Sequence, residues 1–362
     1  MQDGYRFLFG PVRSRRLGRS LGIDLVPLKV CTYDCPYCQV GVTTLKTLER
    51  RDYVPVVDVL AEFDHWLAQD GQADCVTLAG GGEPTLHARF GEVIDAIGAR
   101  TKLRRILLSN GSLFFLPEVR AAAIKAEVVK ATLSSWDQAS FEQVHHPHPD
   151  LRFDTFVAGL KALRREFKGE YWLEVFAVPG VNDTSAQMIR IAEVARLIAP
   201  DRIHLNTAVR PAQDGKTLSV SVAELEEFAK LFNPVAEVVG VSQSLAQPQT
   251  EVITHAELAT RILSLLQRHP CTASDISGTI GQSVSEVEKT LKDLLEQGAL
   301  RLEHRDTQNY FVANSPEPLN PFFLPLYSSL GLRYPVNGSV IFCRYVSSSR
   351  SYSVSASSPI SR

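Results

Sequence analysis

Three cysteines lie within eight residues near the start of this 362-residue chain. Cys31, Cys35 and Cys38 have the spacing C-x3-C-x2-C, and Asp34 makes the segment between them polar. Three thiolates on one short loop can each bind one iron of a [4Fe–4S] cube, which leaves the fourth iron without a protein ligand. An iron with a free coordination position can bind a small molecule. The spacing therefore predicts one [4Fe–4S] cluster per chain, bound by these three cysteines.

Zinc is the main alternative for this loop, because thiolates also bind Zn²⁺. Structural zinc sites usually take cysteine pairs from two separated places, and the other cysteines, Cys75, Cys271 and Cys343, form no such pair. They are also too few for an auxiliary cluster. The N-terminus has no secretory signal pattern, and no run of 18 apolar residues occurs. We therefore expect a cytoplasmic protein without a membrane partner.

The segments around the cysteine loop alternate between strand-like and helix-like patterns from about residue 20 to 240. Strands are expected at 22–26, 74–79, 105–109, 127–133, 171–178 and 202–206. Helices are expected at 55–69, 88–97, 118–125, 154–167, 185–198 and 222–231. Repeated β-α units build a parallel sheet, and six units are too few for an eight-stranded barrel. We predict the α/β class with a partial (β/α)6 TIM-like barrel, in which ligands gather at the carboxyl ends of the strands.

The segment from Gly10 to Pro55 resembles the radical S-adenosylmethionine (SAM) superfamily, and more narrowly a branch related to the wyosine-synthesis enzymes that modify tRNA. The resemblance covers residues 5 to about 240. It implies that SAM binds the open iron and is cleaved to a 5′-deoxyadenosyl radical, chemistry that belongs to the cofactors. The radical would abstract hydrogen from a tRNA or another nucleotide, or from a protein or metallocofactor during maturation. An electron donor, flavodoxin- or ferredoxin-like, is the expected partner.

The resemblance also implies a SAM pocket at the strand ends. The residues assigned to it are Tyr37, Gly81, Gly82, Glu83, Asn110 and Ser134. Gly81, Gly82 and Glu83 match the GGEP motif, which in the superfamily holds the methionine amino group of SAM. The tyrosine matches an aromatic position near the adenine, and the last two would contact ribose or carboxylate. From the residues alone, a tight turn at the glycines and helix N-caps at Asn110 and Ser134 are equally good interpretations. No catalytic residue is assigned.

Two further motifs bear on the substrate. Residues 1–19 contain five arginines against one acidic residue, Asp3; they are Arg6, Arg13, Arg15, Arg16 and Arg19. Guanidinium groups could clamp a phosphate or carboxylate, although a solvated basic strand edge has the same composition. His145, His146 and His148 surround Pro147. They could bind metal or handle protons, or their loop could simply bond to backbone groups.

The C-terminal third has a different composition. We divide the chain into a radical SAM core at 1–240, a linker at 241–254, a winged helix-turn-helix-like domain at 255–312 and a Ser-rich tail at 313–362. The winged-helix interpretation rests on helices expected at 257–268, 273–280 and 284–297 and strands at 300–304 and 310–312. The tail holds 13 serines, and we expect it to be disordered.

Charge weighs against DNA as a partner. The chain has a net charge of −2, and residues 257–306 hold six basic side chains against eight acidic ones. Neutralising phosphates requires the opposite balance. This disfavours the alternative of an iron–sulfur redox-sensing regulator that binds DNA. A module that docks a protein or positions an RNA substrate is the favoured interpretation of the winged helix.

Overall fold

The computed structural model describes residues 5–14, 16–208, 219–239, 253–266, 270–305, 308–314, 335–336 and 339–340. The chain divides into two compact units, Met1–Ala313 and Asn314–Arg362. In the second unit, the strands β13 (Pro335–Val336) and β14 (Ser339–Val340) pair antiparallel. The predicted linker at 241–254 and the predicted Ser-rich tail lie almost entirely outside the described residues.

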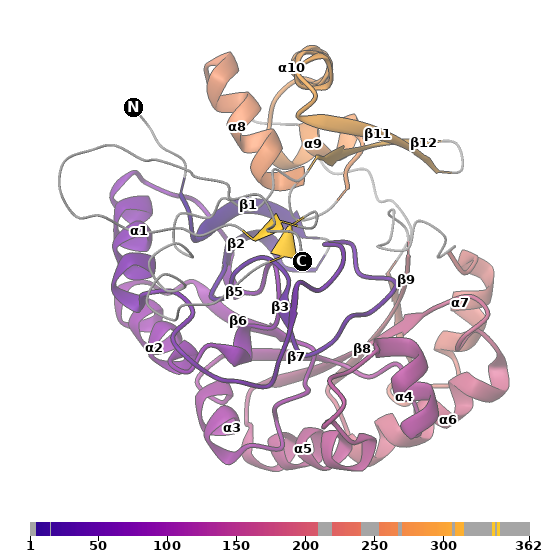
Figure 1. The fold of residues 1–362 in the computed structure, drawn as a ribbon. Helices are drawn as coiled ribbons and strands as arrows, with labels where there is room; N and C mark the ends of the chain where they lie inside the picture. Colours follow the sequence, from indigo (N-terminus) through magenta and orange to yellow (C-terminus); the bar gives the residue numbers. More distant parts are fainter. Residues whose placement is uncertain are drawn as a thin grey trace, which may run out of the picture. The chain divides into compact units, whose positions relative to one another are not determined.

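An eight-stranded sheet forms the centre of the first unit, in the order β1-β2-β5-β6-β7-β8-β9-β10 (Figure 1). Its strands are β1 (Leu8–Ser14), β2 (Gly18–Ile23), β5 (Cys75–Leu78), β6 (Arg104–Ser109), β7 (Val128–Thr132), β8 (Glu170–Ala177), β9 (Arg202–Thr207) and β10 (Glu237–Val239). Strands β2 to β10 run parallel, whereas β1 pairs antiparallel with β2 at the edge. The predicted α/β class and partial barrel are confirmed. The six predicted strands correspond to β2 and β5–β9; β1 and β10 were not predicted.

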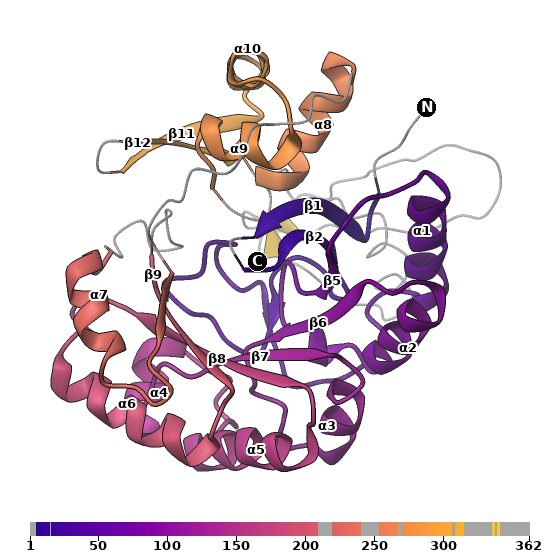
Figure 2. The same cartoon turned by 180° about the vertical axis from the view of Figure 1, so that it is seen from behind.

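Helices line the outer side of this sheet (Figures 1 and 2). They are α1 (Val56–Ala68), α2 (Phe90–Arg100), α3 (Pro117–Ala123), α4 (Gln138–His145), α5 (Phe153–Glu166), α6 (Ser185–Ile198) and α7 (Val222–Ala229), with the short 3-10 helix η1 (Pro84–Leu86) after β5. Helix α6 begins at a capping box of Thr184 and Gln187 and ends at Ala199, which is left-handed. Only α4 has no counterpart among the helices expected from the sequence in this part of the chain.

The two faces of the sheet differ in character. On the outer face Leu107, Val129 and Leu173 are fully buried and pack with helix residues in one apolar core. Alternate residues of a strand point to opposite faces, so their neighbours lie on the inner face. There, Ile106, Val128 and Trp172 build a separate small apolar core with Cys75 and Leu17. We call this the apolar floor of the barrel.

Three helices and a hairpin follow residue 252. They are α8 (His255–Leu266), α9 (Ala273–Ile280), α10 (Val284–Glu296) and the antiparallel strands β11 (Leu300–Arg305) and β12 (Gln308–Ala313). Capping boxes at Thr272 and Ser283 begin α9 and α10, and Ile262, Ile276 and Leu291 are among the residues of their apolar core. The predicted elements are present here, and their assignment as a winged helix stays a prediction. Across the described residues, none of the helices has the length and apolar character needed to span a bilayer.

Candidate functional site

The cysteine loop leaves the barrel after β2 and is closed by its own hydrogen bonds. Cys31 lies on β3 (Val30–Cys31), which pairs with β4 (Leu45–Lys46), and Cys35 and Cys38 lie in the loop between these strands. The Cys38 amide donates to the Cys35 carbonyl at 3.0 Å. The Asp34 carboxylate accepts from the Thr43 amide at 2.8 Å. These bonds hold the three thiols on one compact turn.

Residues 145–148, at the end of α4, fix the loop from outside. The Asp34 amide donates to the carbonyls of His145 and His146, each at 3.2 Å, and the His148 amide donates to the Thr32 carbonyl at 2.8 Å. The His145 ring stacks on Tyr33 with ring centroids 5.1 Å apart. The histidine motif thus supports the loop largely through backbone groups.

The His145 ring also faces the thiols. Its Nδ1 lies 2.9 Å from the Tyr37 hydroxyl and 3.6 Å from Cys35 Sγ. Tyr37 in turn stacks on Phe176 of β8, with ring centroids 4.2 Å apart and planes 15° from parallel. The tyrosine predicted to lie near adenine is therefore held between the loop and the barrel wall.

The three cysteines are partly buried. Burial raises the pKa of Cys31 to about 12, and the Glu83 carboxylate adds to this shift. Burial raises the pKa of Cys35 well above its usual range, and the neighbouring Cys38 and Cys31 contribute next. Buried thiols that raise one another's pKa favour a strongly positive partner, because only positive charge compensates several adjacent thiolates.

Polar side chains also reach the other two sulfur atoms. The Lys29 ammonium donates to Cys38 Sγ at 3.2 Å, and Asn110 Nδ2 lies 3.6 Å from Cys31 Sγ. Among the described residues, no three His, Cys, Asp or Glu side chains converge as ligands of a single metal ion. A [4Fe–4S] cube does not need such convergence, because each thiolate binds a different iron. The donor set therefore fits the cube.

The glycine motif packs against the chain that leads into Cys31. Gly81 O accepts from the Lys29 amide at 2.6 Å, and the Glu83 amide donates to Val30 O at 3.1 Å. A side chain at Gly82 would collide with the Val30 carbonyl. Glycine is required here because two backbone segments touch. The motif joins the end of β5 to the base of the cysteine loop.

The Glu83 carboxylate is turned inward and is 2% exposed. It accepts from Thr85 N at 3.1 Å, Thr85 Oγ1 at 2.6 Å, Ser109 Oγ at 2.7 Å and Asn110 N at 2.7 Å. Burial raises its pKa, and these donors oppose the rise. The side chain joins the ends of β5 and β6.

The two remaining predicted residues differ in position. Asn110 Nδ2 donates to Thr32 Oγ1 at 2.7 Å, so its amide lies beside the cysteine loop. Ser134 is fully buried, and its Oγ accepts from the Phe176 amide at 2.9 Å. Its carbonyl accepts from Asn182 Nδ2 at 2.8 Å. Asn110 thus joins the site, whereas the Ser134 hydroxyl joins β7 to β8.

A charged layer that we did not predict lies on the inner face of the barrel. It comprises Arg16, Lys130, Glu174 and His204. Lys130 Nζ lies 2.7 Å from Glu174 Oε1, and these side chains are 19% and 18% exposed. His204 is fully buried, and neither of its ring nitrogens has a hydrogen-bond partner. A carboxylate oxygen of Glu237 lies 3.8 Å from His204 Nε2.

Charge within this layer is uneven. Burial tends to raise the pKa of Glu174, but Lys130 and then Arg16 outweigh it, so the pKa is lowered. Burial lowers the pKa of His204 to about 3, and Arg16 and Lys130 contribute to the shift. The imidazole is therefore neutral at physiological pH. A charged residue at alternate positions of otherwise apolar central strands was the sequence signal for this layer.

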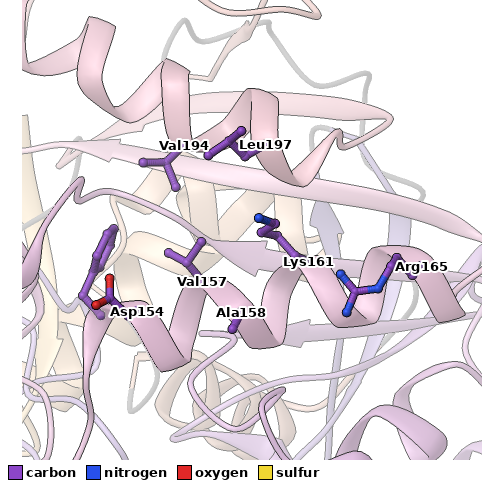
Figure 3. A pocket seen from close by; sticks show the side chains of 8 residues that line it. Asp154, Val157, Ala158, Lys161, Arg165, Val194 and Leu197 are labelled. Carbon is purple, nitrogen blue, oxygen red and sulfur yellow. The ribbon is translucent and has the colours of Figure 1, made fainter.

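A surface hollow of about 390 Å³ lies elsewhere, between α5 and α6 (Figure 3). Its lining residues are Phe153, Asp154, Val157, Ala158, Lys161, Arg165, Val194 and Leu197. None of the residues predicted to bind a metal or cofactor lines it. The hollow is separate from the cysteine loop.

Residues 25–192 match the family model described as the Radical SAM superfamily. The chain is 35% identical over 300 residues to a protein named GTPase Obg from Brachyspira hyodysenteriae, across 82% of this chain but only 43% of that protein. It is 32% identical over 278 residues to a UPF0026 protein of Helicobacter pylori, across 76% of this chain and 88% of that protein. Among solved structures, Streptococcus suis SuiB bound to S-adenosylmethionine aligns with a TM-score of 0.46 and 15% identity, over 64% of this chain and 53% of that chain.

Proposed function

We propose that this chain, which belongs to the UPF0026 family and is a radical SAM superfamily enzyme, binds one [4Fe–4S] cluster through Cys31, Cys35 and Cys38. The observation that carries the proposal is the set of three partly buried thiols on one hydrogen-bonded loop, directly against the glycine motif. When bound, the cluster supplies the electron that cleaves SAM to a 5′-deoxyadenosyl radical, which abstracts hydrogen from the substrate.

The residues around the thiols have distinct proposed tasks. Lys29 and Asn110 donate to cysteine sulfurs, and hydrogen bonds of this kind tune the potential of a bound cluster. The backbone of Gly81, Gly82 and Glu83 would hold the methionine amino group of SAM. Tyr37, braced by its stack on Phe176, would pack near the adenine.

Asn110 and Ser134 would contribute differently to SAM binding. The Asn110 amide lies next to the loop and would contact SAM directly. Ser134 would act through the β8 backbone, because its hydroxyl already accepts from the Phe176 amide. That bond fixes the residue on which Tyr37 stacks.

The substrate is proposed to be a tRNA or another nucleotide, on the resemblance of residues 5 to about 240 to the wyosine-synthesis branch. Residues 255–312, proposed as a winged helix, would position RNA or dock a protein. Their six basic and eight acidic side chains at 257–306 weigh against DNA binding. The electron would come from a flavodoxin- or ferredoxin-like donor.

Anaerobic reconstitution tests the cluster. The wild-type chain should take up about four irons and turn brown, and dithionite with SAM should release 5′-deoxyadenosine. Cys31→Ala, Cys35→Ala and Cys38→Ala should each lose most of the iron. Cys75→Ala is the matched control, because this thiol lies in the apolar floor and should leave iron content unchanged.

Two results would contradict the proposal. One is a wild-type chain that stays colourless and free of iron after repeated loading. The other is a fully loaded chain that releases no 5′-deoxyadenosine from SAM.

A further inference from the structure

We propose that the charged layer inside the barrel is a substrate subsite that binds an anionic group, either a carboxylate or a phosphate. This inference rests on the proposed function, because it assigns the layer to the substrate of the same site. It goes further in naming the chemistry by which the substrate is held and the residues that hold it.

The position of the layer fits such a role. Glu174 lies two residues before Phe176 on β8, so both side chains are on the inner face, about 7 Å apart along the strand. The Phe176 ring stacks on Tyr37 of the cysteine loop. A ligand anchored beside Glu174 therefore has its next few atoms at the level of the loop, where hydrogen abstraction would take place.

The composition of the layer is costly for the fold alone. Strands in the middle of a parallel sheet are usually apolar on both faces, because both faces are covered. Placing Lys130 and Glu174 there requires partial desolvation of two charges. His204 adds a fully buried ring whose two nitrogens have no hydrogen-bond partner. Such groups call for an explanation, and a ligand that completes their bonds is one.

The exposed fractions of two side chains indicate that solvent or a ligand can reach the layer. Lys130 and Glu174 keep 19% and 18% of their side-chain surface exposed, although β7 and β8 are central strands. Trp172 packs edge-on beneath His204, with ring centroids 5.1 Å apart, and belongs to the apolar floor. The floor precedes the charged layer along the strands, whereas the cysteine loop follows their carboxyl ends.

The charge balance selects an anion. The charged groups that act on this layer are Arg16, Lys130 and Arg202, which are positive, and Glu174 and Glu237, which are negative, while His204 is neutral. The layer therefore has a surplus of one positive charge. Lys130 offers a compact ammonium and Arg16 a guanidinium, and both bind carboxylate and phosphate oxygens. The neutral His204 ring can donate one further hydrogen bond.

Anion binding by the reconstituted holoenzyme with SAM present tests the proposal. Isothermal titration calorimetry with inorganic phosphate and, separately, with malonate at matched ionic strength distinguishes the two sources of anion. Lys130→Met should weaken the affinity for the preferred anion tenfold or more. Glu174→Gln should tighten it several-fold, because it removes the competing carboxylate.

The opposite signs of these two variants separate binding from folding damage, which would weaken binding in both. Lys161→Met is the matched control: it removes the same charge from α5, on the wall of the outer hollow, and should leave the affinity unchanged. The proposal is overturned if wild type binds neither anion, if Lys130→Met and Lys161→Met behave alike, or if Glu174→Gln weakens binding. A chain that binds iron and cleaves SAM but fails these tests refutes the subsite alone, whereas an iron-free chain refutes the proposed function.

Discussion

The outer and inner faces of the barrel strands are built from alternate residues of the same short segments, yet the side chains on the two faces differ in polarity and burial. On β8, Leu173 and Val175 face outward, are fully buried and belong to the large apolar core. Their neighbours Trp172 and Glu174 face inward, and Glu174 keeps a partner charge and some solvent contact. The outer face thus provides most of the apolar burial that stabilises the fold, whereas the inner face also carries polar and charged groups beyond its apolar floor.

Truncation on the outer face should have the largest effect. Leu173→Ala removes a fully buried side chain from the apolar core. The free energy of unfolding should fall by about 2–5 kcal/mol, from lost transfer energy plus the cavity. Urea denaturation of the iron-free chain measures this. A loss below about 1 kcal/mol would mean that the outer face does not dominate stability.

On the inner face, replacing one member of the ion pair should lower the free energy of unfolding by less than Leu173→Ala does, and replacing both members should hardly change it. Lys130→Met leaves the Glu174 carboxylate without its 2.7 Å partner and should destabilise the fold by about 1–3 kcal/mol. The double variant Lys130→Met/Glu174→Leu should return to within about 1 kcal/mol of wild type, because no lone charge remains. The same urea titrations provide the measurement. If the double variant is less stable than the single one, the ion pair itself holds the barrel together.

Lowering the pH should change the free energy of unfolding by a smaller amount, through Glu174 on the inner face. The pKa of Glu174 is lower in the folded chain than in the unfolded one, because Lys130 and Arg16 outweigh its burial. Its contribution to stability is therefore present above the unfolded pKa of about 4.3 and is lost as the pH falls through the folded pKa. Wild type should lose more stability than Glu174→Gln between about pH 6 and about pH 3. Parallel curves for the two chains would contradict this assignment.

The smallest effect on stability is expected at His204. Replacing this ring by an apolar side chain removes two unsatisfied nitrogens, so His204→Leu should equal wild type or exceed it by up to about 1 kcal/mol. The same variant should weaken anion binding, as expected for a residue kept for function at the expense of stability. Thermal melts and calorimetry on one preparation measure both. A clear loss of stability would show that His204 is a packing residue.

The difference between the faces also explains what the sequence could predict. Regular patterns give the six central strands, and for α6 the expected range 185–198 agrees with the structure, because a capping box and a left-handed Ala199 define its ends. Helix α4 was missed because its eight residues start with polar side chains and bury few apolar ones. Strand β1 was missed because Arg13 and a register shift between Phe9 and Val12 disturb the alternation.

The candidate site divides in the same way. Cysteine spacing is local, so three candidate ligands could be named without a fold. The charged layer is assembled from single residues on three strands and from Arg16, and no local motif unites them. Likewise, nothing adjacent in sequence to Glu83 indicates that its carboxylate bonds to Ser109 and Asn110 rather than to a ligand.

The hydrogen bonds that hold the cysteine loop bear on whether the loop stays folded without a bound cluster. Asp34, Thr43 and His148 hold the loop through bonds that involve no iron. A zinc finger collapses when its metal leaves, because the metal supplies its folding energy. If the proposed cluster were lost from this loop, these bonds would remain, so the loop would stay folded and the same chain could be loaded again.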